Sequence, residues 1–134
     1  MSAEAQAQWD RAVRSLRAAA LLVDGDPDSA ASRAYYAAFH AASALFALKG
    51  RTFTKHSAVQ AAVYRELVHA GVWETALGKD YSFLVELRFT GDYGGTRRVG
   101  SDEARDAVRR ARRILDAVRT GAPDIFAEMP DSGK

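Results

Sequence analysis

Cysteine is absent from this sequence of 134 residues, and proline occurs only three times. The absence of cysteine excludes disulfide bonds, cysteine zinc sites and thiol nucleophiles, so packing must hold the chain together, and a reducing compartment is expected. A chain of this length accommodates one domain rather than two. Since 48% of the residues are hydrophobic and 27% are charged, the composition is that of a globular protein.

A long apolar run is also missing. The longest uncharged stretch, residues 34–48, includes His40 and Ser43 and is too short to cross a membrane. The N-terminal sequence MSAEAQAQWD has no basic region followed by an apolar one, as a targeting segment would. We therefore expect a cytoplasmic protein that does not contact a membrane.

Charge is nearly balanced in total but unevenly distributed. The formal net charge is +2, whereas residues 88–119 contain nine basic and five acidic residues. Fifteen of the 19 cationic residues are arginine, whose planar guanidinium binds phosphate through two hydrogen bonds. The C-terminal quarter is therefore a candidate surface for phosphate groups.

Apolar residues recur at spacings of three and four, the period of an amphipathic helix. The pattern predicts helices over residues 9–23, 27–49, 54–70, from 73 or 77 to about 90, and 101–119. No segment alternates with a period of two, so the predicted fold class is all-α, a bundle of four or five helices. A single domain of residues 1–120 is expected, followed by a flexible tail over residues 121–134.

Several residues predict where these helices begin and end. Asp26 is the expected N-cap of the second helix, with Pro27 in its first turn. Thr54 and Ser101 are the expected caps of the third and last helices. Four glycines fall within residues 91–100, which predicts the longest loop of the domain there.

The second predicted helix is apolar nearly all round and contains nine alanines. Such a helix is buried by several neighbouring helices or by a partner chain. Because a small solitary bundle covers it poorly, this composition favours a dimer.

Two segments look like ligand-binding loops but lack required residues. Three aspartates within residues 24–28 have the spacing of calcium ligands, yet Ser29 and Tyr35 stand where that loop needs Gly and Glu. A helix-capping turn is predicted instead. Residues 91–100 lack the Gly-Lys-Ser/Thr ending of a phosphate-binding loop, and no two histidines have metal-ligand spacing. No metal site and no cofactor are therefore expected.

Arg33, Tyr36 and His40 form a polar stripe on the second predicted helix. Their spacing places them on one face over about two turns, roughly 10 Å. An unpaired buried arginine is costly, so this face should meet a carboxylate, water or another subunit. Either Arg33 pairs with an acid and His40 simply packs, or the stripe lines a cleft that binds a ligand.

Three segments, 32–42 (SRAYYAAFHAA), 55–59 (KHSAV) and 86–93 (ELRFTGDY), precede the closing amphipathic helix. In order and spacing they resemble the HEPN domain family, and more narrowly its stand-alone prokaryotic branch. The resemblance implies a small antiparallel helical bundle that forms a homodimer and is often encoded beside a minimal nucleotidyltransferase. Many members are ribonuclease toxins that use an Arg, followed after four to six residues by His, at a cleft between two protomers. The nucleotidyltransferase then acts as antitoxin.

This sequence departs from that motif. The resemblance aligns Arg88 with the motif arginine, but Asp92 and Tyr93 stand where the histidine is expected. RNA cleavage without a metal needs a base for the 2′-hydroxyl proton and a cation for the developing phosphorane charge. Arg88 is the candidate cation and His40 or Asp92 the candidate base, although an aspartate, with a pKa of about 4, is a weak base. Alternatively, Arg88 and Asp92 form a salt bridge that locks the loop.

The candidate ligand-binding residues are Arg33, Tyr36, His56 and Tyr93. His56 matches a motif of the branch, but its position at a helix start is equally explained by local capping. The sequence thus predicts a component of a toxin–antitoxin or defence module that binds RNA or a nucleotide. It is also a candidate metal-independent endoribonuclease, although the expected histidine after Arg88 is absent. The alternatives are a non-catalytic dimer that binds a nucleotide or partner nucleotidyltransferase, and a purely structural helical dimer.

Overall fold

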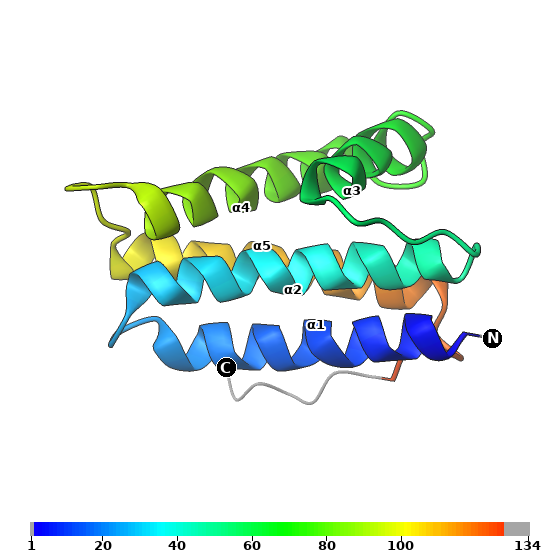
Figure 1. Cartoon of the computed structure of the whole chain (residues 1–134), viewed down its shortest axis with the longest axis horizontal. Helices are drawn as coiled ribbons and strands as arrows, with labels where there is room; N and C mark the ends of the chain where they lie inside the picture. Colours follow the sequence, from blue (N-terminus) through cyan, green and yellow to red (C-terminus); the bar gives the residue numbers. More distant parts are fainter. Residues whose placement is uncertain (1, 128–134) are drawn as a thin grey trace.

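The computed structural model describes residues 2–127, which form five α-helices and no strand (Figure 1). The long helices are α1 (Ala3–Leu22), α2 (Pro27–Ala47), α4 (Thr75–Tyr93) and α5 (Ser101–Gly121). The short helix α3 (His56–Ala62) continues into a π-helical segment, η1 (Val63–Val68). The predicted all-α bundle of four to five helices is confirmed. None of the helices within residues 2–127 is long and apolar enough to span a bilayer.

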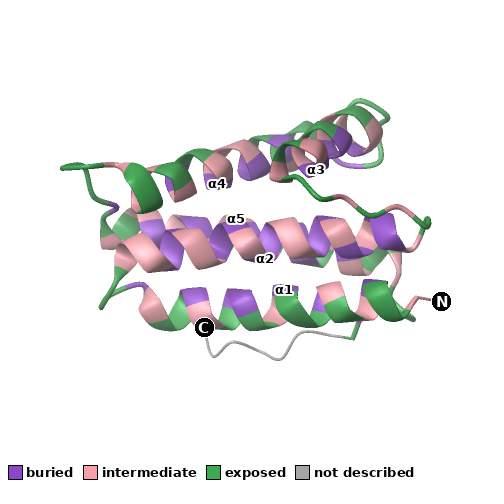
Figure 2. Ribbon diagram, viewed as in Figure 1, coloured by how far each residue is buried: buried purple, intermediate pink, exposed green. Residues whose placement is uncertain are grey.

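Helix α2 is the centre of the bundle. It packs against α1, α4 and α5, and it runs antiparallel to α1 and α4 (Figure 1). Eight of its alanines are completely buried, because small side chains let three helices approach closely (Figure 2). Since the chain covers α2 by itself, the apolar surface of this helix no longer favours a dimer. The dimer stays a prediction.

The predicted start of α2 is confirmed. Asp26 is its N-cap, and the carboxylate accepts a hydrogen bond from the backbone N–H of Ser29 at 3.2 Å. Pro27 occupies the first turn, where its missing N–H has no helical partner to lose.

Two other predicted caps are wrong. Helix α3 starts one residue later than expected, with Lys55 at the cap position instead of Thr54 and no side-chain cap. Helix α5 is capped at Gly100, whose backbone N–H donates to Oε1 of Glu103 at 3.0 Å, and Ser101 is already its first residue. Here the carboxylate three residues into the helix supplies the hydrogen bond that a serine cap would have made.

Helix α4 extends beyond its predicted end, so the glycine-rich loop is shorter than expected. Asp92 and Tyr93 lie in the last turn of α4 instead of in a loop. Gly91 does not end the helix. It lets α4 pack closely against α2, because a Cβ at this position would lie 2.7 Å from the backbone oxygen of Asp28. The remaining loop is tied to α2 by the backbone N–H of Val99, which donates to Asp28 at 2.8 Å.

The variant Gly91→Ala is expected to lose about 1–3 kcal/mol of unfolding free energy, because the added methyl group forces α4 away from α2. Helix propensity alone predicts the opposite sign, a gain of about 1 kcal/mol. Urea denaturation measures the difference. Gly121→Ala, where the added Cβ has only an ordinary contact at 3.8 Å, is the matched control and should cost nothing. A Gly91→Ala protein as stable as wild type would contradict the close-packing role.

The chain after α5 returns to α1. The ring of Phe126 is completely buried and stacks on Trp9 with 5.0 Å between ring centres. The indole N–H of Trp9 donates to the backbone oxygen of Ala127 at 3.3 Å. Residues 122–127 are thus part of the packed domain rather than a flexible tail, because one aromatic side chain extends the core. The rest of the predicted tail, residues 128–134, lies outside the described residues.

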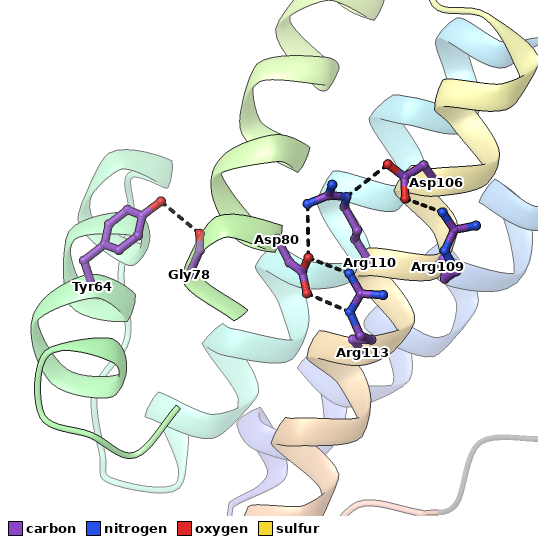
Figure 3. Close-up of polar contacts among 7 residues, drawn as sticks. All are labelled: Tyr64, Gly78, Asp80, Asp106, Arg109, Arg110 and Arg113. Atoms are coloured by element: carbon purple, nitrogen blue, oxygen red, sulfur yellow. Dashed lines mark hydrogen bonds and ion pairs between the residues drawn. The ribbon is translucent and has the colours of Figure 1, made fainter. Parts of the chain in front are cut away.

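One carboxylate is buried between α4 and α5. Asp80, with its side chain 3% exposed, accepts hydrogen bonds from Arg110 at 3.2 Å and from Arg113 at 3.0 and 2.7 Å (Figure 3). Arg110 also contacts Asp106 at 3.2 Å, and its guanidinium carbon lies 4.1 Å from the ring centre of Phe83. We call Asp80, Arg110 and Arg113 the Asp80 clasp, because they join α4 to α5.

Candidate functional site

The polar stripe predicted on the second helix lies on the partly exposed side of α2. Arg33, Tyr36 and His40 are all partly exposed, whereas the alanines between them are buried. α1 contacts this side through Gln8, and α4 contacts it through Arg88. The stripe is therefore bordered by two helices but not covered.

Arg88 is held against this stripe. Its Nη2 donates to the hydroxyl of Tyr36 at 3.2 Å, and its Nε donates to Asp92 at 3.1 Å. The guanidinium carbon lies 5.2 Å from the ring centre of Tyr35 and 5.4 Å from that of Tyr36. The salt bridge with Asp92 that the sequence allowed is thus present, but it spans one turn of α4 rather than a helix and a loop. Both tyrosine rings fix the guanidinium in place.

His56, the first residue of α3, packs against aromatic rings of α2 that Arg88 also contacts. Its ring centre lies 4.4 Å from that of Phe39, 5.5 Å from Tyr36 and 5.7 Å from Tyr35. Arg88 lies over the same two tyrosine rings, so the imidazole and the guanidinium share their neighbours. Burial, and then the positive charge of Arg88, lower the pKa of His56. The imidazole is therefore neutral near pH 7 and able to accept a proton.

His40 lies further along the stripe and is held from α1. Its Nδ1 donates to Oε1 of Gln8 at 2.7 Å. Burial lowers the pKa of His40 to about 4, and the charges of Arg11, Arg33 and His56 act in the same direction. This imidazole is neutral near pH 7, but its low pKa makes it a weaker base.

The contacts described above connect six of the seven predicted site residues. Arg33 completes it, with its guanidinium carbon 4.8 Å from the ring centre of Tyr36. We call this group the Arg88 cluster: Arg33, Tyr36, His40, His56, Arg88 and Asp92.

Tyr93, the seventh predicted residue, faces elsewhere. Neighbouring residues on a helix point about 100° apart, so Tyr93 and Asp92 do not share a face. The Tyr93 side chain is 63% exposed, and its ring lies 5.2 Å from that of Phe89. Its expected contact with a ligand stays a prediction.

Gln8, Tyr35 and Phe39 contribute to the site but were not predicted. Tyr35 and Phe39 supply rings to the cluster, yet in the sequence they have the spacing of ordinary core residues. Gln8 is one of many polar residues on an amphipathic helix, and only the packing of α1 on α2 distinguishes it. The partner helix of a site cannot be identified from periodicity.

Ion pairs occupy much of the basic C-terminal quarter. At least seven of its nine arginines lie within 4.0 Å of a carboxylate. Arg105, for example, bridges Asp24 and Asp102, each at 3.1 Å. The phosphate-facing surface predicted for this quarter stays a prediction, and most of its cations already have an anionic neighbour.

A cavity of about 530 Å³ lies between η1, α4 and α5, away from the Arg88 cluster. Its lining includes Tyr64, whose hydroxyl donates to the backbone oxygen of Gly78 at 3.3 Å, and Arg110 of the Asp80 clasp (Figure 3). None of the predicted site residues lines it. Within residues 2–127, no three His, Asp or Glu side chains are grouped as a metal ion would require.

The sequence profile described as the HEPN domain matches residues 5–121, which includes the five helices except the first two residues of α1, and the whole Arg88 cluster. The chain belongs to the HEPN domain family. The resemblance inferred from the three sequence segments is thereby confirmed.

Individual relatives of this HEPN protein match over most of their length. A UPF0332 protein of Thermotoga maritima is 40% identical, over 87% of this chain and 90% of its own. A protein of Methanocaldococcus jannaschii, named as a candidate toxin, is 30% identical over 92% of both chains. A UPF0332 protein of Gloeobacter violaceus is 34% identical over 71% of this chain and 76% of its own.

The lowered pKa of His40 predicts a pH-dependent stability. Between its ordinary pKa of 6.5 and about 4, the unfolded chain binds a proton that the folded protein does not, so the unfolding free energy falls as pH falls. The full shift corresponds to at most about 3 kcal/mol, because partial exposure to solvent screens the charges. His40→Gln should remove this part of the pH dependence in urea titrations between pH 7 and 4. The control His69→Gln, at an exposed position, should keep the pH dependence of the wild type. Parallel curves for wild type and His40→Gln would contradict the prediction.

Proposed function

We propose that this HEPN protein is a toxin-type module that binds RNA and cleaves it without a metal ion at the Arg88 cluster. The observation that carries the proposal is the pairing of a fixed guanidinium, Arg88, with the neutral imidazole of His56 on the same tyrosine rings. Arg88 is also the residue at which the family motif begins in the resemblance. A relative named as a candidate toxin supports the toxin-type assignment.

In this mechanism His56 is the general base. It accepts the 2′-hydroxyl proton, the 2′ oxygen attacks the neighbouring phosphorus, and the 5′ oxygen leaves with a proton from water. The products are a 2′,3′-cyclic phosphate and a 5′-hydroxyl end. Arg88 stabilises the negative charge that develops on the phosphorane oxygens. His56 thereby takes the place of the histidine that is absent after Arg88.

The other members of the Arg88 cluster have supporting roles. Arg33 and Tyr36 bind the phosphate chain, since the Tyr36 hydroxyl accepts a hydrogen bond from Arg88 and Arg33 lies over the ring of Tyr36. Asp92 positions Arg88 rather than acting as base, because its carboxylate already accepts the hydrogen bond of that arginine. His40 holds the α1 side of the site through Gln8, and its low pKa disfavours it as the base.

The proposal includes the assembly that the family resemblance implies. Two copies of the chain would meet at the partly exposed side of α2, and a minimal nucleotidyltransferase would act as antitoxin in the cytoplasm. Sedimentation of the purified protein tests the first part, and a strict monomer at micromolar concentration would remove the cleft between copies.

The test of the proposed activity is incubation of the purified protein with RNA in excess EDTA. We expect cleavage that survives chelation and leaves 2′,3′-cyclic phosphate ends, detected by mass spectrometry. Arg88→Ala protein prepared identically controls for contaminating nucleases. No cleavage, or cleavage that EDTA abolishes, would overturn the metal-independent mechanism.

One observation favours a second candidate, a non-catalytic binding module. The histidine of the family motif is missing, and Arg88 is already paired with Asp92. Binding of labelled nucleotide or of a co-expressed nucleotidyltransferase without RNA cleavage would establish this candidate instead.

A further inference from the structure

Two aromatic side chains are exposed beside the Arg88 cluster. Phe89 and Tyr93 lie one turn apart near the end of α4, 62% and 63% exposed, with 5.2 Å between their ring centres. Within residues 2–127 they are the only aromatic residues among the exposed large hydrophobic ones. Two adjacent exposed rings offer π faces on which another aromatic group can stack.

Arginines flank this pair on both sides. Arg88 precedes Phe89 and points toward α2. On the other side, Arg97 donates from Nη1 to the hydroxyl of Thr90 at 2.9 Å. It also pairs with Glu103 at 3.5 Å, and its side chain is 61% exposed. The helical step of 100° places Phe89 between Arg88 and Thr90. The two rings therefore form a ridge between a fixed cation and an exposed one.

We infer that Phe89 and Tyr93 form a stacking platform for the bases of single-stranded RNA that extends from the Arg88 cluster. The inference rests on the proposed function and adds a binding subsite to it. Aromatic faces stack on any base, and arginines beside them contact the phosphate chain. In a duplex the bases are already stacked on one another, so only an unpaired strand reaches the platform.

The size of the patch favours RNA over a second copy of the chain. A fully exposed aromatic side chain offers about 200 Å², so the two rings expose roughly 250 Å² together. A stable protein interface needs about 800 Å² from each partner. Two bases of a single strand match two adjacent rings, whereas this patch alone is too small to hold a dimer together.

Binding of a fluorescently labelled, single-stranded 2′-O-methyl oligonucleotide tests the inference. This probe lacks the free 2′-hydroxyl and is not cleaved, so binding is measured independently of activity. We expect the double variant Phe89→Ala/Tyr93→Ala to weaken binding at least tenfold. Leu21→Ala, at an exposed position on α1, should change nothing, and Tyr93→Phe should retain binding because it keeps the ring.

Two further measurements separate stacking from charge and from folding. The double variant Phe89→Ala/Tyr93→Ala, called the platform variant, should leave the dependence of affinity on salt unchanged. Arg97→Ala should lower the slope of log affinity against log salt concentration by about one. An abasic version of the probe should bind wild type and platform variant equally. Circular dichroism of each variant checks that the fold is intact.

Several results would overturn the inference. These are unchanged binding by the double variant, equal affinity for a duplex probe, no binding of the probe by wild type, and loss of binding together with dissociation of a dimer in sedimentation. The last result would assign the ridge to an interface between copies. Platform-dependent binding without cleavage of ordinary RNA would refute only the proposed activity, and cleavage with normal binding by the double variant would refute only the platform.

Discussion

Replacing Arg88 with alanine is expected to lower the rate of RNA cleavage by about 10²–10³-fold, the loss typical of removing one donor that stabilises a transition-state charge. The guanidinium is fixed before substrate binds, by two tyrosine rings and by hydrogen bonds to Tyr36 and Asp92. Little reorganisation is therefore needed when charge develops on the phosphate. The effect should appear in the first-order rate constant of cleavage, measured under single-turnover conditions with saturating protein.

The matched variants for this experiment are Arg88→Lys and Arg17→Ala. Lysine keeps a positive charge but loses the planar fork, so it should restore only part of the activity. Arg17 is exposed on α1, and its loss should leave the rate unchanged. Wild-type activity in Arg88→Ala protein with an intact circular dichroism spectrum would show that the reaction occurs elsewhere.

Removing both arginines of the Asp80 clasp is expected to cost about 3–5 kcal/mol of unfolding free energy at neutral pH. Asp80 has a side chain only 3% exposed, and in Arg110→Ala/Arg113→Ala it remains buried without either partner. A buried carboxylate without a counter-charge is far more costly than the loss of an exposed ion pair. Urea denaturation at pH 7 measures the loss.

Two variants separate the buried charge from general damage to α5. Arg109→Ala removes an exposed arginine that pairs with Asp106 at 2.6 Å on the same helix, and its cost should stay within about 0.5 kcal/mol. Adding Asp80→Asn to the double variant removes the buried charge and should recover part of the lost stability. If the triple variant were no more stable than the double, burial of the charge would not be the cause.

Local sequence signals predicted the parts of the fold that local chemistry determines. The periodicity of apolar residues identified the long helices, and Asp26 followed by Pro27 identified the start of α2. The predicted end of α4 was wrong because the sequence does not show whether a glycine ends a helix or lets another helix pack closely against it. Only the approach of Asp28 to Gly91 distinguishes the two.

The segment after α3 is a second case that periodicity does not reveal. The backbone N–H of His69 donates to the oxygen of Tyr64 at 2.8 Å, five residues back, so η1 is π-helical. A helix with one widened turn has almost the same pattern of apolar residues as an ordinary one. Packing of Tyr64 on Gly78 in α4, visible only in three dimensions, accompanies this turn.

For the candidate site, the sequence predicted the polar face of α2 but not the side chains from other helices that pack against it. The stripe on α2 follows from the spacing of three residues on one helix. The proximity of His56 to Arg88 joins positions 32 residues apart and depends on how α3 and α4 pack around Tyr35 and Tyr36. Tyr93 was expected in a loop, whereas the structure places it in the last turn of α4, because the helix ends three residues later than predicted.

The contact between Trp9 and Phe126 has a consequence for folding. It closes a loop that contains almost the whole chain, and the entropy lost in closing so long a loop is large compared with one ring contact. The contact is therefore stable only when α1 and α5 are already in place. The segments around Trp9 and Phe126 consequently belong to the same cooperative unit as the core, and a truncation that removes either ring removes one half of the same aromatic pair.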